Sequence, residues 1–235
     1  MNSRIPQIAN PGEFHKTDFT ESPLVEIQSD ARFEAGLEYA KLGMAHAVTK
    51  CLVREEVYEK LILAHSFLPE GYRFYIYDAW RPFLLQEELY RDISEKVIHQ
   101  FHLENAPEEE QLKRIAAFVS VPRKDTDYPP VHTTGGAVDL TILDAQGQFP
   151  DMGSAFDEIS ERSDTVYIEE HPEETNAKII RENRRLLYNA MTKAGFTNLP
   201  SEWWHYDFGD RFWAYYTGKP AMYRGVFEKT DLNYS

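Results

Sequence analysis

The sequence predicts an α+β fold in a single domain, in which a small central antiparallel sheet carries a metal site and helices pack around that sheet. Three observations support this prediction. Segments with helical spacing of apolar residues are mixed with short segments in which every second residue is apolar. Turn signals rich in Gly, Asp and Pro are placed to join neighbouring strands as hairpins. The chain has 235 residues, 42% of them hydrophobic, which is enough to enclose one substantial core.

The N-terminal segment is predicted to be an extended arm, residues 1–23, ahead of one domain at residues 24–235. Proline and glycine recur along the arm and disfavour regular structure there. Residues 24–27 are expected to form a short strand. A helix is expected over residues 54–68, because apolar residues recur there at helical spacing and the segment ends before a Pro-Glu-Gly sequence.

The next three elements are a strand and two helices. Residues 72–77 alternate as a strand that ends just before Arg81. A helix follows Pro82, with one apolar side formed by Leu85, Leu89, Ile93, Val97 and Phe101. Glu108, Glu109 and Glu110 open a further helix, since acidic residues are favoured at a helix N-terminus.

The middle of the chain is predicted to form the central strand and a hairpin. Within residues 137–143, Val138, Leu140 and Ile142 point to one side, and Ala137, Asp139 and Thr141 point to the other. The sequence Asp144-Ala145-Gln146-Gly147 is expected to be a hairpin turn. The acid-rich residues 158–174 are expected to be a solvated loop at the rim of a cleft.

The clearest helix prediction covers residues 176–194, which end at a glycine. Its core face is expected to be Ile179, Ile180, Leu186, Leu187, Ala190, Met191 and Ala194, with the basic group Arg181, Arg184 and Arg185 in water. Residues 208–212 are expected to form a hairpin turn, and residues 213–216 the returning strand.

An acidic residue inside the central strand is the first sign of a site. Burying Asp139 is costly unless a positive partner meets it, and a metal ion is one such partner. His132 precedes Asp139 across a bend at Gly135 and Gly136, which lets the histidine fold back towards the acid. The alternative is a surface-facing aspartate with an unrelated loop histidine.

A second acidic residue and histidine follow near the C-terminus, in Glu202-Trp203-Trp204-His205-Tyr206. Hydrolytic zinc uses three protein ligands and an open position, with a nearby carboxylate as base. His132, Asp139 and His205 form a suitable ligand set and leave Glu202 as the base. Residues three apart on a strand face opposite ways, so Glu202 is predicted to lie in a turn begun by Pro200. Alternatively, the aromatic residues are core and the two polar residues incidental.

A third segment, Asp78-Ala79-Trp80-Arg81-Pro82, places an arginine at the end of a strand. Arg81 cannot lose its charge, and its fork of N–H donors suits a carboxylate or an oxyanion. The alternative is a structural Arg–Asp pair.

Four motifs in order resemble the D-alanyl-D-alanine dipeptidase family of zinc metallopeptidases, relatives of the zinc D,D-carboxypeptidases with the Hedgehog-type zinc fold. They are D-x-x-R-P at Arg81, H-x3-G-x2-D from His132 to Asp139, M-G-S-x-F-D ending at Asp157, and E-W-W-H-Y beginning at Glu202. The resemblance makes residues 24–235 a zinc peptidase domain.

It implies one zinc ion per chain, bound by His132, Asp139 and His205. Glu202 would be the catalytic base and Arg81 the transition-state stabiliser, and Asp157 could meet the ammonium group of a substrate.

The sequence departs from the family pattern where the substrate amine is bound. Pro130 stands in place of a serine two residues before the first zinc histidine, and residues 27–33 lack the expected tyrosine. The expected function is zinc-dependent hydrolysis of a D-Ala-D-Ala-type dipeptide, and the expected partner is a small peptide substrate that contains D-alanine. Alternatives are a zinc D,D- or L,D-carboxypeptidase or amidase acting on peptidoglycan fragments, and a non-catalytic zinc-containing binding protein.

Composition excludes other classes. A net charge of −14 argues against a nucleic acid or an anionic membrane surface as partner. One cysteine, Cys51, rules out an internal disulfide framework, and the start of the chain lacks the apolar core of a signal peptide, so a cytoplasmic location is expected. The absence of a G-x-S-x-G motif disfavours a serine hydrolase. Four further histidines are not expected to be ligands: His65, His99, His102 and His171.

Overall fold

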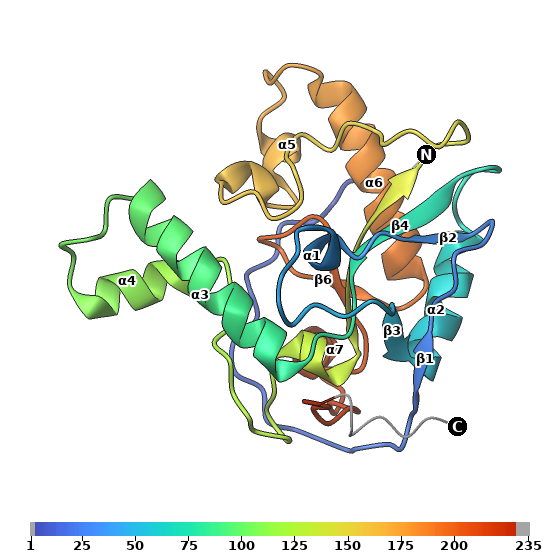
Figure 1. The fold of residues 1–235 in the computed structure, drawn as a ribbon. Helices are drawn as coiled ribbons and strands as arrows, with labels where there is room; N and C mark the ends of the chain where they lie inside the picture. Colours follow the sequence, from blue (N-terminus) through green and yellow to red (C-terminus); the bar gives the residue numbers. More distant parts are fainter. Residues whose placement is uncertain (1–2, 229–235) are drawn as a thin grey trace.

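A five-stranded sheet runs through the centre of the molecule in the computed structural model, which describes residues 3–228 (Figure 1). The strands are β1 (Leu24–Glu26), β2 (Phe33–Ala35), β3 (Leu52–Arg54), β4 (Arg73–Asp78), β5 (Ala137–Leu143), β6 (Thr197–Asn198) and β7 (His205–Asp207). The helices are α1 (Glu38–Lys41), α2 (Glu55–His65), α3 (Phe83–Gln100), α4 (Glu108–Ile115), η1 (Val131–Thr134), η2 (Glu161–Ser163), α5 (Tyr167–Glu170), α6 (Ala177–Lys193) and α7 (Arg211–Thr217), where η marks a 3-10 helix. The predicted α+β class is confirmed.

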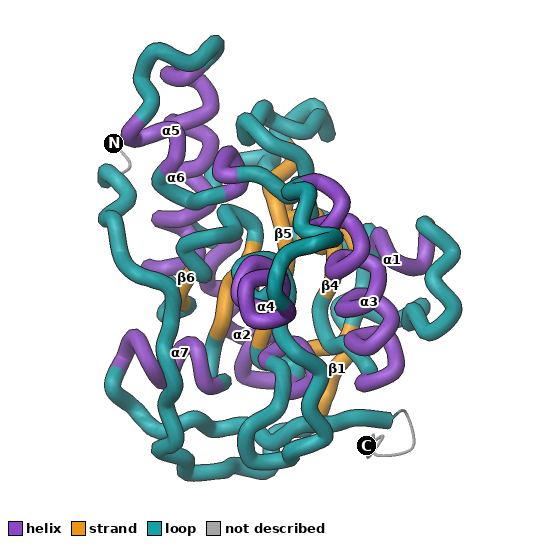
Figure 2. The backbone as a smooth tube through the Cα atoms, turned by 90° about the vertical axis from the view of Figure 1, so that its left-hand side faces the viewer, coloured by secondary structure: helices purple, strands orange, loops and turns teal. Residues whose placement is uncertain are grey.

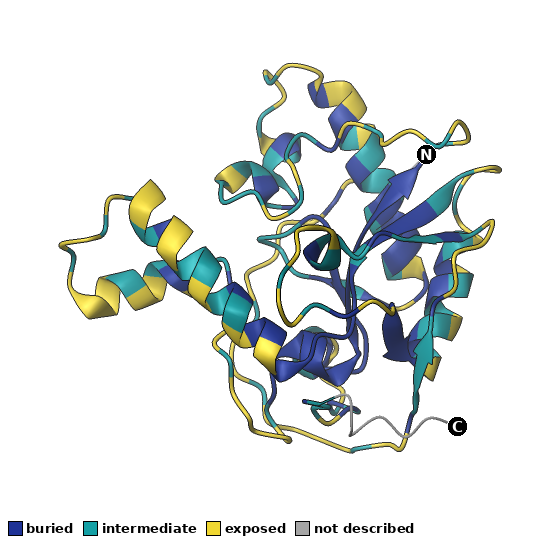
Figure 3. Ribbon diagram, viewed as in Figure 1, coloured by how far each residue is buried: buried dark blue, intermediate teal, exposed yellow. Residues whose placement is uncertain are grey.

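The sheet has the order β2-β4-β5-β7-β6, and all its pairs are antiparallel except β2 with β4. A separate antiparallel pair joins β1 to β3. All seven residues of β5 are buried (Figure 3), because its two faces are both covered. Its apolar face, with Leu140 at the centre, belongs to the same core cluster as Leu61 of α2 and Leu187 of α6. Its other face carries Asp139.

Helices α3 and α4 form a hairpin that projects from the body of the protein (Figure 1). The two helices share a small apolar cluster around Val97, Ile115 and Val119. The predicted helices over residues 54–68, after Pro82 and from Glu108 are thus confirmed as α2, α3 and α4. Within residues 3–228, no helix combines the length and apolar character needed to cross a bilayer.

The N-terminal arm packs along the molecule rather than standing free. It runs down past α7 and along the lower edge before it reaches β1 (Figure 2). Ile5 is buried, and Asn189 on α6 donates a hydrogen bond to the carbonyl of Ser3. Further along, Thr17 forms an isolated parallel bridge with Ala221. Residues 1–2 of the predicted arm and 229–235 of the predicted domain lie outside the described residues.

One predicted hairpin and one predicted strand are wrong. Asp144 to Gly147 do form a turn, closed by the N–H of Gly147 on the carbonyl of Asp144, but residues 148–160 form bends and loops in place of a returning strand. Residues 211–217 form α7 instead of a strand. The Asp210 side chain accepts hydrogen bonds from the N–H groups of Phe212 and Trp213, which is the arrangement of a helix N-cap.

The acid-rich segment 158–174 is only partly the solvated loop that was predicted. It contains η2 and α5, and Ser163, Thr165 and Ile168 are buried. The reason is Arg184, which was predicted to face water and is instead buried at 2% exposure. Helix α6 otherwise lies where it was predicted. Ile179 is exposed rather than in the core, and Arg185, which was predicted to face water, is half-buried and paired with Glu169 at 2.6 Å.

The Arg184 guanidinium binds backbone rather than a carboxylate. It donates to the carbonyl oxygens of Met152 at 2.7 Å, Arg162 at 2.6 Å and Asp164 at 2.6 Å. One side chain therefore ties residues 152–164 to α6, and this segment includes Asp157.

We expect Arg184→Met to lower the free energy of unfolding by about 3 kcal/mol, because it leaves several buried carbonyl groups without a donor. Urea denaturation measures the change. Lys178→Met, on the exposed side of the same helix, is the matched control and should change it by less than about 0.5 kcal/mol. Equal effects of the two substitutions would show that Arg184 does not hold the segment.

Candidate metal centre

Asp139 lies on β5 at a position where both neighbouring strands, β4 and β7, are paired with it. In the strand register it is paired with His205 of β7 on one side and with Asp78 of β4 on the other. The side chains of Asp139 and His205 therefore project from neighbouring strands towards the same face. The distance from Asp139 Oδ1 to His205 Nδ1 is 2.9 Å.

His132 reaches the same point from η1, the short helix just before β5. Gly135 ends η1 with φ of 75°, a left-handed conformation that glycine adopts without strain, and the chain then turns into β5. His132 Nδ1 lies 2.8 Å from the carbonyl oxygen of Ala79, so Nδ1 carries the proton and donates it. The unprotonated Nε2 is left facing Asp139 Oδ2 at 3.3 Å.

His205 is oriented from behind by an acid on its own strand. Its Nε2 donates to Asp207 Oδ1 at 2.8 Å, which directs Nδ1 towards Asp139 and towards His132 Nε2 at 3.2 Å. Burial lowers the pKa of His205, but Asp207 and Asp139 outweigh burial and hold the pKa well above its usual value. Burial and the charge of Asp207 raise the pKa of Asp210.

The three side chains fit a divalent metal ion. Each offers one ligand atom, and these atoms lie within 4.8 Å of one another. Two imidazole nitrogens and one carboxylate oxygen make a ligand set of the kind found in hydrolytic zinc sites, and the backbone and carboxylate partners of the two rings match the usual support of such ligands. Asp207 and Asp139 favour a positive charge on His205, and they would equally favour a metal ion bound to its ring in place of the extra proton.

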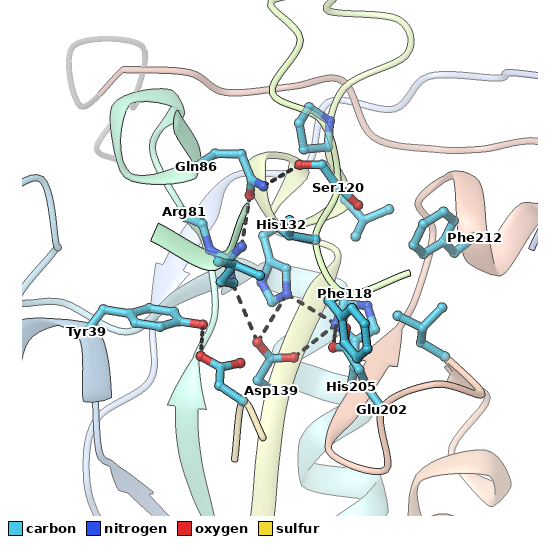
Figure 4. Close-up of a pocket in the computed structure, with 16 residues that line it drawn as sticks. Tyr39, Arg81, Gln86, Phe118, Ser120, His132, Asp139, Glu202, His205 and Phe212 are labelled. Atoms are coloured by element: carbon cyan, nitrogen blue, oxygen red, sulfur yellow. Dashed lines mark hydrogen bonds and ion pairs between the residues drawn. The ribbon is translucent and has the colours of Figure 1, made fainter. Parts of the chain in front are cut away.

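Arg81 lies beside the three ligand candidates, as Figure 4 shows. Its guanidinium donates to Asp78 Oδ2 through Nε at 3.0 Å and to Gln86 Oε1 at 2.9 Å, and it lies 3.6 Å from Asp139 Oδ2. Burial disfavours its charge, but Asp78 and Tyr39 more than offset burial and raise the pKa of Arg81. The structural Arg–Asp pair is therefore present, and the same guanidinium also lines the cavity.

Glu202 lies in the turn begun by Pro200, as the three-residue spacing from His205 predicted. Its N–H donates to the carbonyl of Leu199, which closes the turn just before β7. Glu202 Oε2 is 3.8 Å from His205 Nδ1. Burial, with smaller effects from Asp139 and Asp157, raises the pKa of Glu202 to about 8, although His205 opposes this shift.

Asp157 is placed at one end of the cavity by a loop that Arg184 holds. Tyr39 donates to Asp157 Oδ2 at 2.8 Å. Burial and the neighbouring charge of Asp139 raise the pKa of Asp157 to about 7. Asp157 also has φ of 58°, an uncommon conformation for a residue other than glycine.

Tyr39 was not predicted, because the family pattern places a tyrosine within residues 27–33. Tyr39 lies on α1, and neither its spacing nor its neighbours in the sequence mark it. Asp207 was also missed, although a signal was available: residues two apart on a strand point to the same side, so Asp207 had to share a side with His205. Gln86 on α3 carried no such signal.

The three ligand candidates line one small cavity of about 50 Å³ together with Arg81, Glu202, Asp157 and Tyr39. His65, by contrast, bonds the carbonyl of Tyr72, His99 is exposed beside Glu104, and His171 stacks on Tyr167, so all three lie apart from the metal group. The full lining of the cavity is Tyr39, Arg81, Gln86, Ile93, Phe118, Val119, Ser120, Pro130, Val131, His132, Asp139, Asp157, Leu199, Glu202, His205 and Phe212.

We expect Asp207→Asn to weaken binding of zinc by about 10- to 100-fold, because the amide orients His205 less firmly and removes a charge behind it. Competition with a chromophoric chelator measures the dissociation constant. Asp92→Asn, on the exposed side of α3, is the control and should leave the constant unchanged. An unchanged constant in Asp207→Asn would show that Asp207 does not support a metal ligand.

Comparison with known proteins places the chain in a family. The family model described as D-ala-D-ala dipeptidase matches residues 22–221. The D-alanyl-D-alanine dipeptidase of Synechocystis sp. is 29% identical over 191 residues, which cover 75% of this chain and 77% of that protein. The dipeptidase of Enterococcus faecium is 26% identical over 68% of this chain and 75% of its own length, and that of Escherichia coli (strain K12) is 43% identical over 32% and 36%. The chain belongs to the D-Ala-D-Ala dipeptidase family of metallopeptidases.

Proposed function

We propose that this peptidase is a zinc-dependent dipeptidase that hydrolyses a D-Ala-D-Ala-type dipeptide. The observation that carries the proposal is the convergence of five side chains on one cavity: His132, Asp139, His205, Glu202 and Arg81. The peptidase domain is proposed to comprise residues 24–235, with residues 1–23 as an arm packed against it.

His132, Asp139 and His205 would hold the zinc ion through Nε2, a carboxylate oxygen and Nδ1. A bound zinc ion supplies Lewis acidity, which acidifies water and polarises a carbonyl group. A purely structural zinc site normally has four protein ligands. Within residues 3–228 the candidate group has three ligands, beside an acid and an arginine, which supports a catalytic rather than a structural role.

Glu202 is proposed as the general base. Its carboxylate would take a proton from the attacking water and later give it to the amine that leaves. Its turn lies directly before β7, so the position of the base is tied to that of His205. A carboxyl group whose pKa lies near neutrality can serve in both steps, and burial gives Glu202 this property.

Arg81 is proposed to stabilise the negative charge that develops on the carbonyl oxygen. Asp78 and Gln86 fix the guanidinium from two sides, so it need not reorganise when that charge appears. Removal of a comparable donor costs roughly 3 to 4 kcal/mol in the transition state.

Asp157 and Tyr39 are proposed to bind the free amine of the substrate. Pro130 has neither a hydroxyl nor an N–H to offer, whereas the phenol of Tyr39 and the carboxylate of Asp157 lie together in the same cavity. An ammonium group there would compensate the buried charge of Asp157 and lower its pKa.

We expect Glu202→Gln to bind zinc normally and to lose turnover by about 10²- to 10⁴-fold, because the amide cannot accept the proton. His205→Ala should lose both zinc and turnover. Metal analysis after dialysis, together with kcat on the same samples, separates the two effects. Near-normal activity of Glu202→Gln would rule out this residue as the base.

We expect Asp157→Asn to lower kcat/KM for D-Ala-D-Ala by about 10- to 100-fold, the range for loss of a hydrogen bond to a charged group. The preference for D-Ala-D-Ala over its N-acetyl derivative should shrink in parallel, since the derivative has no ammonium. Asp151→Asn, an exposed acid near the start of the same loop, is the control. An unchanged preference would place the amine elsewhere.

The proposed function is tested by release of free D-alanine from D-Ala-D-Ala, with and without a chelator and with zinc restored. Release that the chelator stops and zinc restores is the expected result. A zinc-loaded protein that spares this dipeptide but cleaves longer D,D- or L,D-peptides would be a carboxypeptidase instead. A protein that binds zinc and cleaves none of them would be a binding protein.

A further inference from the structure

A second and larger cavity opens beside the candidate metal centre. It has a volume of about 290 Å³, against about 50 Å³ for the first. The two cavities share four lining residues, Val119, Ser120, Pro130 and Phe212, and therefore meet along this boundary. In Figure 4, Tyr39 lies on one side of the metal group, and Ser120 and Phe212 lie on the opposite side.

The charged side chains that line this second cavity are Arg123, Arg211 and Glu13. Arg211 donates from Nε to the carbonyl oxygen of Pro129 at 3.1 Å, and its guanidinium carbon lies 4.2 Å from the centre of the Phe212 ring. Among the described residues, no carboxylate forms an ion pair with either arginine.

Three acids lie near the arginines without neutralising them directly. Glu13 is 79% exposed and lies 3.6 Å from His15. Asp210 and Asp207 lie behind Arg211, where the first caps α7 and the second accepts from His205. Two of the three charged side chains that line the cavity are nevertheless cationic, although the whole chain carries a net charge of −14.

The N-terminal arm forms one wall of this cavity with Pro11 and Gly12. Tyr216 on α7 donates to the carbonyl of Ala9, which fixes the arm close to that helix. A Cβ atom at Gly12 would lie 3.2 Å from the ring of Tyr215, so the close approach favours glycine. The wall is thus built from packed residues.

The direction of the substrate follows from the proposed function, on which this inference rests. With the amine at Asp157 and the scissile carbonyl at Arg81, the leaving residue must extend away from Asp157. The cavity beside Asp157 and Glu202 has a volume of about 20 Å³, against about 290 Å³ for the second cavity. The leaving residue is therefore directed across Pro130 and Phe212 into the second cavity.

We propose that Arg211 and Arg123 select dipeptides whose leaving residue carries an anionic side chain. A carboxylate extended from the leaving residue would meet two unpaired guanidinium groups, which suit carboxylates through their fork of donors. Pro130, which replaces the serine expected from the family pattern, contributes an apolar part of the boundary between the two cavities. The substrate class is thus a D-alanyl dipeptide with an acidic C-terminal residue.

The test compares kcat/KM of the zinc-loaded protein for D-Ala-D-Glu, D-Ala-D-Gln and D-Ala-D-Ala. Gln has the same shape as Glu and no charge, so the ratio of Glu to Gln isolates the charge. We expect this ratio to be about 10 or more, the effect of a hydrogen bond to a charged group. It should fall towards 1 in Arg211→Gln and in Arg123→Gln.

Arg123 is exposed, so Arg123→Glu tests the charge without disturbing packing and should turn the preference towards D-Ala-D-Lys. Lys178→Gln removes a positive charge on the far helix α6 and should keep the ratio of the unmodified protein.

A ratio near 1 in the unmodified protein, or an equal loss on all three peptides in both arginine variants, overturns the inference. If D-Ala-D-Ala is still cleaved in that case, the proposed function stands. If none of the peptides is cleaved, the proposed function fails and this inference fails with it.

Discussion

The molecule depends on how the carboxylate of Asp139 is accommodated in the middle of the sheet. Burial of a charge in a sheet is costly unless it is paired and hydrogen-bonded. Here His205 meets one oxygen of Asp139, and His132 and Arg81 lie near the other. A slip of one residue along β5 would turn Asp139 into the apolar core and separate it from all three partners. Charge pairing and apolar packing thus select the same register, and that register brings the metal-ligand candidates His132, Asp139 and His205 together.

Helices and strands in which apolar residues recur at one regular spacing were predictable from the sequence. Helix α6 and strand β5 each combine a regular apolar spacing with a clear end signal, and both were placed within a few residues. The turn at Glu202 was also predictable, because two residues three apart on a strand cannot share a side and one of them had to leave the strand. The metal group followed from the chemistry of its ligand types, and the strand pairing then brings those residues together.

The features that were not predicted depend largely on contacts between residues far apart in the sequence, and the order of residues within one segment does not reveal such contacts. Arg184 looks like a surface residue of an amphipathic helix, yet it is buried because carbonyl groups from a segment 20 to 32 residues earlier converge on it. Tyr39 reaches Asp157 across 118 residues of sequence. Helix α7 was missed for a different reason: its aromatic residues have strand propensity, and the N-cap at Asp210 decided the outcome.

The docked N-terminal arm has a consequence for how the protein is made. The arm is synthesised before its partners Asn189, Tyr216 and Ala221, which follow it at long sequence separation. Contacts over such long separations form late, since the intervening chain must be synthesised and closed into a loop. One wall of the second cavity is therefore completed only after almost the whole chain has emerged. A nascent chain that has not yet reached Ala221 therefore has an incomplete second cavity.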